Sequence, residues 1–131
     1  MADILVPVGP ADVVDQMTVL QACASADPNR RAASARRLAG IQGRAAAVLP
    51  QGSGVDLLRA GLVAARLDVI ALEADMRDCE IRADFGIGFV ALVRAYLDAL
   101  DILDSSKLAY DTHVEPLLPA NELAPSHSHL D

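Results

Sequence analysis

Residues 54–83 read GVDLLRAGLVAARLDVIALEADMRDCEIRA, and this stretch decides the fold. Apolar residues recur in it at alternating steps of four and three, which is the repeat of a helix that packs along one face. The members of this first row are Leu58, Leu62, Ala65, Val69, Leu72, Met76, Cys79 and Ala83. The stretch therefore predicts a long helix with a coiled-coil-like seam at the centre of the protein.

Charged residues flank the first row and suggest how two copies of the helix could pair. If two copies run antiparallel, Arg66 faces Glu73 of the second copy, and Arg59 faces Glu80. Exposed ion pairs of this kind contribute only about 0–1 kcal/mol each, so burial of the row must supply most of the affinity. The predicted interaction residues are Leu58, Leu62, Val69, Leu72, Met76, Arg59, Arg66, Glu73 and Glu80. The alternative is an ordinary buried helix in a monomeric bundle.

A second apolar row lies largely on the opposite side of the same helix. Its members are Val63, Leu67, Ile70, Ala74 and Ile81. A helix that is apolar on two sides is expected to be covered on two sides. We therefore expect this helix to be central either in a bundle or in an oligomer.

The composition limits the class of protein. A chain of 131 residues with net charge −7 predicts one acidic domain. The hydrophobic fraction is 53%, much of it alanine, and no uncharged run approaches the ~18 apolar residues of a membrane span. The first residues show no basic segment and no long apolar run, so we expect no secretory signal. Cys23 and Cys79 fit no zinc or redox spacing, which predicts buried, reduced thiols in a cytoplasmic protein.

Proline and glycine mark the other helix boundaries. Pro10 and Pro28 suit first helical turns, and Asp27 suits an N-cap. The predicted helices cover residues 10–25, 28–49, 54–83 and 89–111. A turn at Gly86–Gly88 would let the last helix fold back, and a bend in one longer helix is the alternative. The four aromatic residues predict the best-packed core beside the last helix; they are Phe85, Phe89, Tyr96 and Tyr110.

The predicted architecture is an all-α bundle of three to four helices with a long central helix. An N-terminal arm covers residues 1–9, the helical domain covers 10–112, and an extended, proline-containing tail covers 113–131. Leu117, Leu118 and Leu123 could dock onto a helix or a partner, with a disordered tail as the alternative.

No pattern in the chain predicts a catalytic residue, a cofactor site or a metal site. Asp98, Asp101 and Asp104 recur every three residues, which is typical of an exposed helix face. His127 and His129 lie in the predicted tail, which cannot hold a metal in fixed geometry without further ligands. The chain also lacks the lysine of a phosphate-binding loop.

Five arginines gather in the segment from Arg30 to Arg44, and no acidic residue lies between Pro28 and Ser53. They are Arg30, Arg31, Arg36, Arg37 and Arg44. The segment could contact phosphates of a nucleic acid, but the acidic bulk of the chain argues against this as its main role. Pairing with the acidic half of the chain, within or between copies, explains the cluster equally well.

We therefore expect a non-catalytic helical protein–protein interaction module, such as an adaptor, a chaperone-like partner or a subunit of an assembly. It would self-associate as a homodimer or larger species through the helix at residues 54–83. One alternative is a small helical DNA-binding regulator that uses Arg30–Arg44. The other is a helical-bundle small-ligand binder or enzyme with a pocket near Tyr96 and Tyr110.

Overall fold

The computed structural model describes residues 8–23 and 25–119, and these residues form four α-helices and no strand. The helices are α1 (Pro10–Ala22), α2 (Pro28–Val48), α3 (Ser53–Ile81) and α4 (Ile87–Val114), followed by a short 3-10 helix, η1 (Glu115–Leu117). The predicted all-α class and the order of four helices are confirmed. The turn before α4 also shows that the chain folds back after α3 rather than continuing as one long helix.

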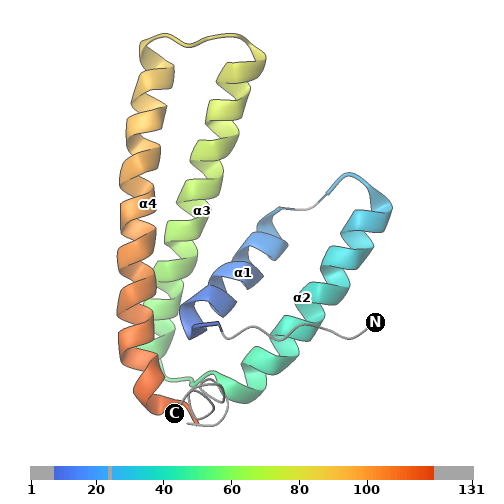
Figure 1. The fold of residues 1–131 in the computed structure, drawn as a ribbon, viewed down its shortest axis with the longest axis vertical. Coiled ribbons are helices and arrows are strands. Elements are labelled where there is room, and N and C mark those ends of the chain that lie inside the picture. The colour runs from blue at the N-terminus through green and yellow to red at the C-terminus, as the bar shows by residue number, and fades with distance from the viewer. Residues whose placement is uncertain (1–7, 24, 120–131) are drawn as a thin grey trace, which may run out of the picture.

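The helices are arranged around one long hairpin (Figure 1). α3 and α4 run antiparallel and pack against each other along their length. α1 lies against the half of this hairpin that contains the start of α3 and the end of α4, and it contacts both helices. α2 packs mainly against α1, on the side away from the hairpin. The long central helix that the sequence predicts is therefore one arm of the hairpin.

Short local signals explain most of the helix ends. The carboxylate of Asp27 accepts a hydrogen bond from the backbone N–H of Asn29 at 2.9 Å, which caps α2 as predicted. Pro10 and Pro28 occupy first turns, where the missing N–H costs nothing. α1 ends at Ala22, three residues earlier than predicted, and α4 extends three residues beyond the predicted end at Asp111.

The end of α3 has a backbone conformation that the sequence does not signal. Ala83 adopts a φ of +55°, and the N–H of Asp84 donates to the carbonyl of Cys79 at 2.8 Å. This is the geometry of a helix C-terminus that glycine usually fills, because a Cβ is strained there. We expect Ala83→Gly to raise the free energy of unfolding by about 1 kcal/mol in urea titrations. The same change at the exposed, mid-helical Ala95 should lower it by about as much, and a loss at Ala83 would contradict this description.

The core lies where three helices meet rather than beside the aromatic residues. Its fully buried side chains include Val14 of α1, Leu62 and Val69 of α3, and Tyr110 and Val114 of α4. The prediction of an aromatic core is correct only for Tyr110. Phe85 is 57% exposed, and Phe89 and Tyr96 are half-buried. The reason is that Phe85 and Phe89 stack edge to face near the hairpin turn, beyond the region that α1 covers.

The structure corrects one expectation about the cysteines, and it describes only part of the predicted arm and tail. Cys79 is buried as predicted, but Cys23 is exposed because α1 ends just before it; both are free thiols. In the predicted tail, Leu118 packs against the core and Leu117 is exposed. Residues 1–7 of the predicted arm and residues 120–131 of the tail, with Leu123, His127 and His129, lie outside the described residues.

None of the helices in the described ranges is both long enough and apolar enough to cross a membrane.

Candidate interaction site

The first row of α3, which the sequence assigns to a second copy, faces the interior of the protein. Leu62 and Val69 are fully buried, and Leu58 and Leu72 pack against the core from the side. Met76 is half-buried. The chain's own α4 and α1 occupy this face, so a second copy could reach it only by displacing them. On this side, α3 is therefore an ordinary helix buried by its own chain, which is the alternative interpretation of the sequence.

One of the charged residues beside the first row forms an ion pair within the chain. Arg66 pairs with Asp15 of α1, and its guanidinium donates from Nε at 2.5 Å and from Nη2 at 2.7 Å. Arg59 and Glu73 are half-buried, and Glu80 is exposed. The pairing of Arg66 with Glu73 of another copy stays a prediction, and it would have to compete with this bidentate contact.

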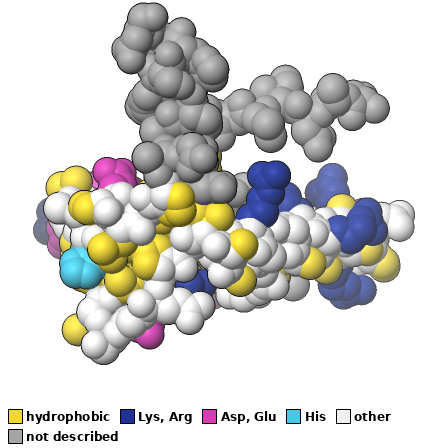
Figure 2. Space-filling view, turned by 90° about the horizontal axis from the view of Figure 1, so that it is seen from below, with side chains coloured by type: hydrophobic (Ala, Val, Ile, Leu, Met, Phe, Trp, Pro, Cys, Tyr) yellow, Lys and Arg dark blue, Asp and Glu magenta, His cyan; other side chains and the backbone are white. Residues whose placement is uncertain are grey.

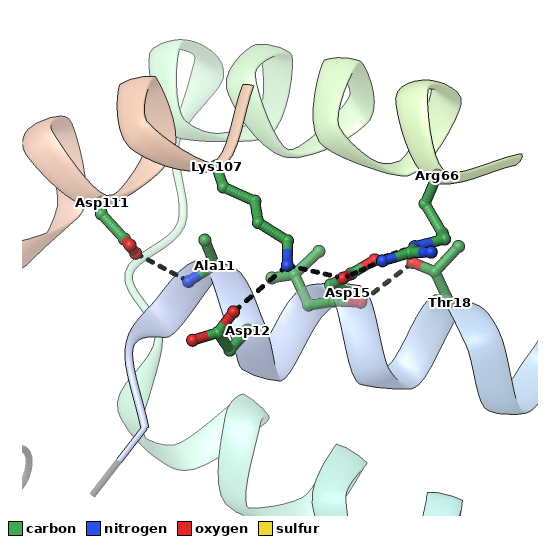
Figure 3. A network of polar contacts seen from close by, with 8 residues as sticks. Ala11, Asp12, Asp15, Thr18, Arg66, Lys107 and Asp111 are labelled. Carbon is green, nitrogen blue, oxygen red and sulfur yellow. Dashed lines mark hydrogen bonds and ion pairs between the residues drawn. The ribbon is translucent and has the colours of Figure 1, made fainter. Parts of the chain in front are cut away.

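Asp15 is the centre of a polar network that fastens α1 to both arms of the hairpin (Figure 3). Arg66 reaches it from α3, and the ammonium group of Lys107 reaches it from α4 at 2.9 Å. Lys107 also donates to Asp12 at 3.3 Å. One turn earlier, the backbone N–H of Ala11 donates to the carboxylate of Asp111 at 2.8 Å. Four contacts therefore hold α1 in one register on α3 and α4.

The cations shift the ionisation of Asp15. Burial by itself would raise the pKa of this carboxyl group, but the hydrogen bonds from Arg66 and Lys107 outweigh burial, and the pKa lies below its ordinary value. Burial lowers the pKa of Lys107, but its contacts with Asp15 and Asp12 together outweigh burial, so the net shift is upward. The three groups thus stabilise one another in their charged forms.

This shift predicts how stability depends on pH. Because the pKa of Asp15 is lower in the folded than in the unfolded chain, its contribution is complete above the ordinary value of 3.8 and is lost as the pH falls through the folded value. We expect the difference in unfolding free energy between the wild type and Asp15→Asn to be constant from pH 7 to about pH 5 and to shrink below about pH 4. Urea titrations at each pH measure this difference. A gap that widens on acidification would contradict the assignment.

A second row on α3, which we call the outer row, lies opposite the core and is exposed along its whole length. It follows the same steps of three and four as the first row. Its members are Leu57, Ala60, Ala64, Leu67, Ala71, Ala74, Asp78 and Ile81, and all eight are exposed. Leu57 is 76% and Ile81 78% exposed.

The outer row overlaps the second apolar row found in the sequence, which we expected to be covered. Leu67, Ala74 and Ile81 belong to both rows and are exposed, while Val63 and Ile70 are half-buried beside them. Within the described residues only one side of the helix is covered, because α1 and α4 both pack on the same half of its surface. That a partner covers the second side stays a prediction. The spacing of apolar residues identifies both rows, but spacing alone does not show which row faces inward.

The apolar surface continues around the turn of the hairpin. Ile87 at the start of α4 is 91% exposed, and Val90 and Leu97 on the same helix are also exposed. Charged residues interrupt the exposed positions of α4, because Arg94 lies between Val90 and Leu97 and Asp101 follows Leu97. The exposed face of α4 is therefore less continuous than the outer row of α3.

α2 carries the five arginines, and all of them are exposed. Arg30 lies 3.9 Å from the carboxylate of Asp27, and no other ion pair of these arginines is found among the described residues. Ala45 is the buried residue of this helix. Basic side chains project from different sides of the part of the molecule formed by α2 (Figure 2). Within residues 54–119, no acidic side chain forms an ion pair with this cluster.

A cavity of about 340 Å³ lies where α1, α2 and the start of α3 meet. Its floor is formed by Val14, Met17 and Leu49, and polar groups of Gln21, Gln42, Gln51 and Arg59 surround it. The sequence placed a pocket near Tyr96 and Tyr110 instead. Tyr110 is fully buried in the core and does not line this cavity.

Tyr110 carries a buried hydroxyl group to which no other described residue makes a hydrogen bond. Burial raises the pKa of this phenol. A buried hydroxyl without a partner costs about 1–3 kcal/mol, so removing it should stabilise the fold. We expect Tyr110→Phe to raise the free energy of unfolding by about 1 kcal/mol in urea titrations, whereas the same change at the half-buried Tyr96 should have little effect. A loss of stability in Tyr110→Phe would show that the hydroxyl has a partner in solution.

Across residues 8–23 and 25–119, no group of three or more His, Cys, Asp or Glu side chains comes together as a metal site requires. Asp98, Asp101 and Asp104 are all exposed, as their spacing predicts.

Comparison with protein-family models finds no family that matches this chain. Searches of curated proteins and of solved structures likewise find no match.

Proposed function

We propose that this protein is a non-catalytic helical interaction module whose binding surface is the outer row of α3. The observation that carries the proposal is the exposure of all eight row positions on a helix whose opposite side forms the core. A contiguous exposed apolar surface on a small protein commonly marks a site of protein association.

The alternating sizes within the row suit a helical partner. Four of its eight positions are alanine, which lets the backbone of a second helix approach closely. Leu57, Leu67 and Ile81 supply larger side chains that can insert between residues of the partner. A flat, charged surface would be expected if this side of α3 served only to keep the protein in solution.

The outer row lies on a helix that is already formed and packed before a partner binds. α3 has 29 residues, and its other side is held by α4 and, through Asp15 and Arg66, by α1. Little order is lost when such a preformed helix binds, which favours association. The free thiols Cys23 and Cys79 fit a reducing compartment such as the cytoplasm, and we include that location in the proposal.

Site-specific photo-crosslinking in the producing cell tests this proposal. A photoreactive residue at Leu67 is expected to give an adduct of defined mass, while the same residue at Ala39, exposed on α2, gives none at that mass. The partner captured in the adduct is then purified on its own. The dissociation constant of its complex with this protein should rise at least tenfold when Ala71 is changed to Arg. If Leu67 yields no adduct beyond the Ala39 control, the outer row is not an interaction surface.

The cavity between α1, α2 and α3 favours a second function, the binding of a small amphipathic anion. Its volume of about 340 Å³ lies at the lower end of ligand sites, and it combines an apolar floor with Arg59 and three amides. A thermal-shift series with short-chain carboxylates would show it. An effect that persists in Arg59→Gln would contradict this assignment.

A further inference from the structure

We propose that the outer row of α3 pairs antiparallel with the outer row of a second copy, and that the arginines of α2 in each copy face the acidic C-terminal half of α3 in the other. This inference rests on the proposed function, because it names the partner of the same surface.

The outer row is long enough for a two-helix interface. It spans 24 residue steps from Leu57 to Ile81, about 36 Å at a rise of ~1.5 Å per residue. The flanking residues Val63 and Ile70 widen it on one side. With its flanks the row offers fewer residues than the 20–30 per side of a standard complex, so we expect a weak, concentration-dependent dimer.

The order of side chains along the row favours the antiparallel direction. In an antiparallel pair that overlaps fully, Leu57 faces Ile81 of the second copy, Ala64 faces Ala74, and Leu67 faces Ala71. The large Leu67 then meets the small Ala71 on both sides of the two-fold axis, which fills the middle of the seam and keeps the helices close.

The parallel direction would fit less well. Each residue would face its own equivalent, so Leu67 would meet Leu67 while Ala64 and Ala71 would each leave a gap. Asp78 would also meet Asp78, and two carboxylates in one apolar seam repel each other. In the antiparallel pair Asp78 faces Ala60 near the end of the seam, where water can reach it.

Charge complementarity points to the same direction. Residues 73–84 carry five acids and two arginines, whereas residues 28–53 carry five arginines and no acid. α2 ends at Val48, and α3 begins at Ser53, so the basic helix leads into the start of the outer row. Antiparallel pairing brings the acidic end of the second α3 to this place. Arg44, near the C-terminal end of α2, thereby gains an acidic partner, whereas among the described residues its own chain provides none.

The pairing also creates one repulsive contact. Asp68, exposed beside the row, meets its equivalent near the two-fold axis, while Ile70 meets Ile70 on the other flank. Replacing Asp68 by Asn should therefore tighten the dimer several-fold. The matched change at Asp98, exposed on α4, should leave the dissociation constant unchanged.

Light scattering on a size-exclusion column over a concentration series gives the first test. The wild type is expected to shift from 13.8 kDa toward twice that mass as the concentration rises into the micromolar range. Ala71→Arg should remain monomeric with unchanged helical circular dichroism, and Ala39→Arg should dimerise like the wild type. A wild type that stays at 13.8 kDa up to millimolar concentration would overturn the inference.

Cysteine crosslinking tests the direction. In a Cys23→Ser background, a mixture of Ala64→Cys and Ala74→Cys chains should form a disulfide-linked dimer on mild oxidation. Each variant alone should form little, because its two thiols lie on opposite sides of the two-fold axis. Crosslinking of either variant alone to the same extent would indicate a parallel pair and overturn the inference.

Salt and charge reversal test the role of α2. Raising the salt concentration should weaken the dimer, and Arg44→Glu should raise its dissociation constant at least tenfold. Retention of the wild type on a DNA column at low salt, with dimerisation unaffected by Arg44→Glu, would overturn the assignment of the arginines to the second copy.

These tests separate the two proposals. If photo-crosslinking at Leu67 captures a different protein and the purified chain is monomeric, the antiparallel dimer is wrong and the interaction surface stands. If Leu67 captures nothing, both proposals fail.

Discussion

Leu62→Ala is expected to lower the free energy of unfolding by about 3–5 kcal/mol. Leu62 is fully buried where α3 meets the other helices, so its truncation leaves a cavity in the core of the described residues. Urea titration of the purified protein measures the change. The helix itself should still form, because alanine favours it.

Leu57→Ala is the matched control, since it makes the same change five residues earlier on the same helix. Leu57 is 76% exposed, so the loss should stay within about 0.5 kcal/mol at concentrations where the protein is monomeric. Equal losses in the two variants would mean that the outer row is buried in solution. Leu62→Ala thus tests the inner side of α3 independently of any partner.

Asp15→Asn should lower the free energy of unfolding by about 2–4 kcal/mol at neutral pH. The change keeps the shape of the side chain but removes the charge that Arg66 and Lys107 share. Both cations are mostly buried, so losing their common partner leaves two like charges close together. Urea titration at pH 7 gives the value.

Asp12→Asn controls for the removal of a carboxylate from the same helix. Asp12 also contacts Lys107, but its side chain is 56% exposed, so the loss should be under about 1 kcal/mol. If the two variants lose the same amount, Asp15 is not the centre of the network. The position of α1 would then depend on apolar contacts alone.

The sequence predicts the helices well because their signals are local. Pro10, Pro28 and Asp27 mark helix starts directly, and the repeat of steps of three and four identifies α3 over its whole length. The C-terminal end of α3 is harder to locate from the sequence, because the residue with positive φ there is Ala83 and not a glycine.

The candidate site could be predicted only in part, because α3 carries two rows with the same spacing. Periodicity identifies both rows but does not distinguish the core from the surface. Side-chain size is the available signal: the first row contains Leu62, Val69 and Leu72, whereas the outer row is half alanine. Larger apolar residues gain more from burial, so they face inward.

The ion network was not predictable, because its members are far apart in the chain. Asp15 and Arg66 are separated by 51 residues, and no local pattern connects them. The acid within an apolar face of α1 was the one hint that a buried partner exists.

The contact between Ala11 and Asp111, which joins residues 100 positions apart, has a consequence for how the chain folds during synthesis. α1 is synthesised before α3 and α4, yet Arg66, Lys107 and Asp111, which hold it in place, lie on those later helices. The hairpin of α3 and α4 depends on contacts closer in the chain, which form quickly. We therefore expect α1 to dock after α3 and α4 have paired, so that the face of α1 that packs on them stays uncovered until α4 has been synthesised.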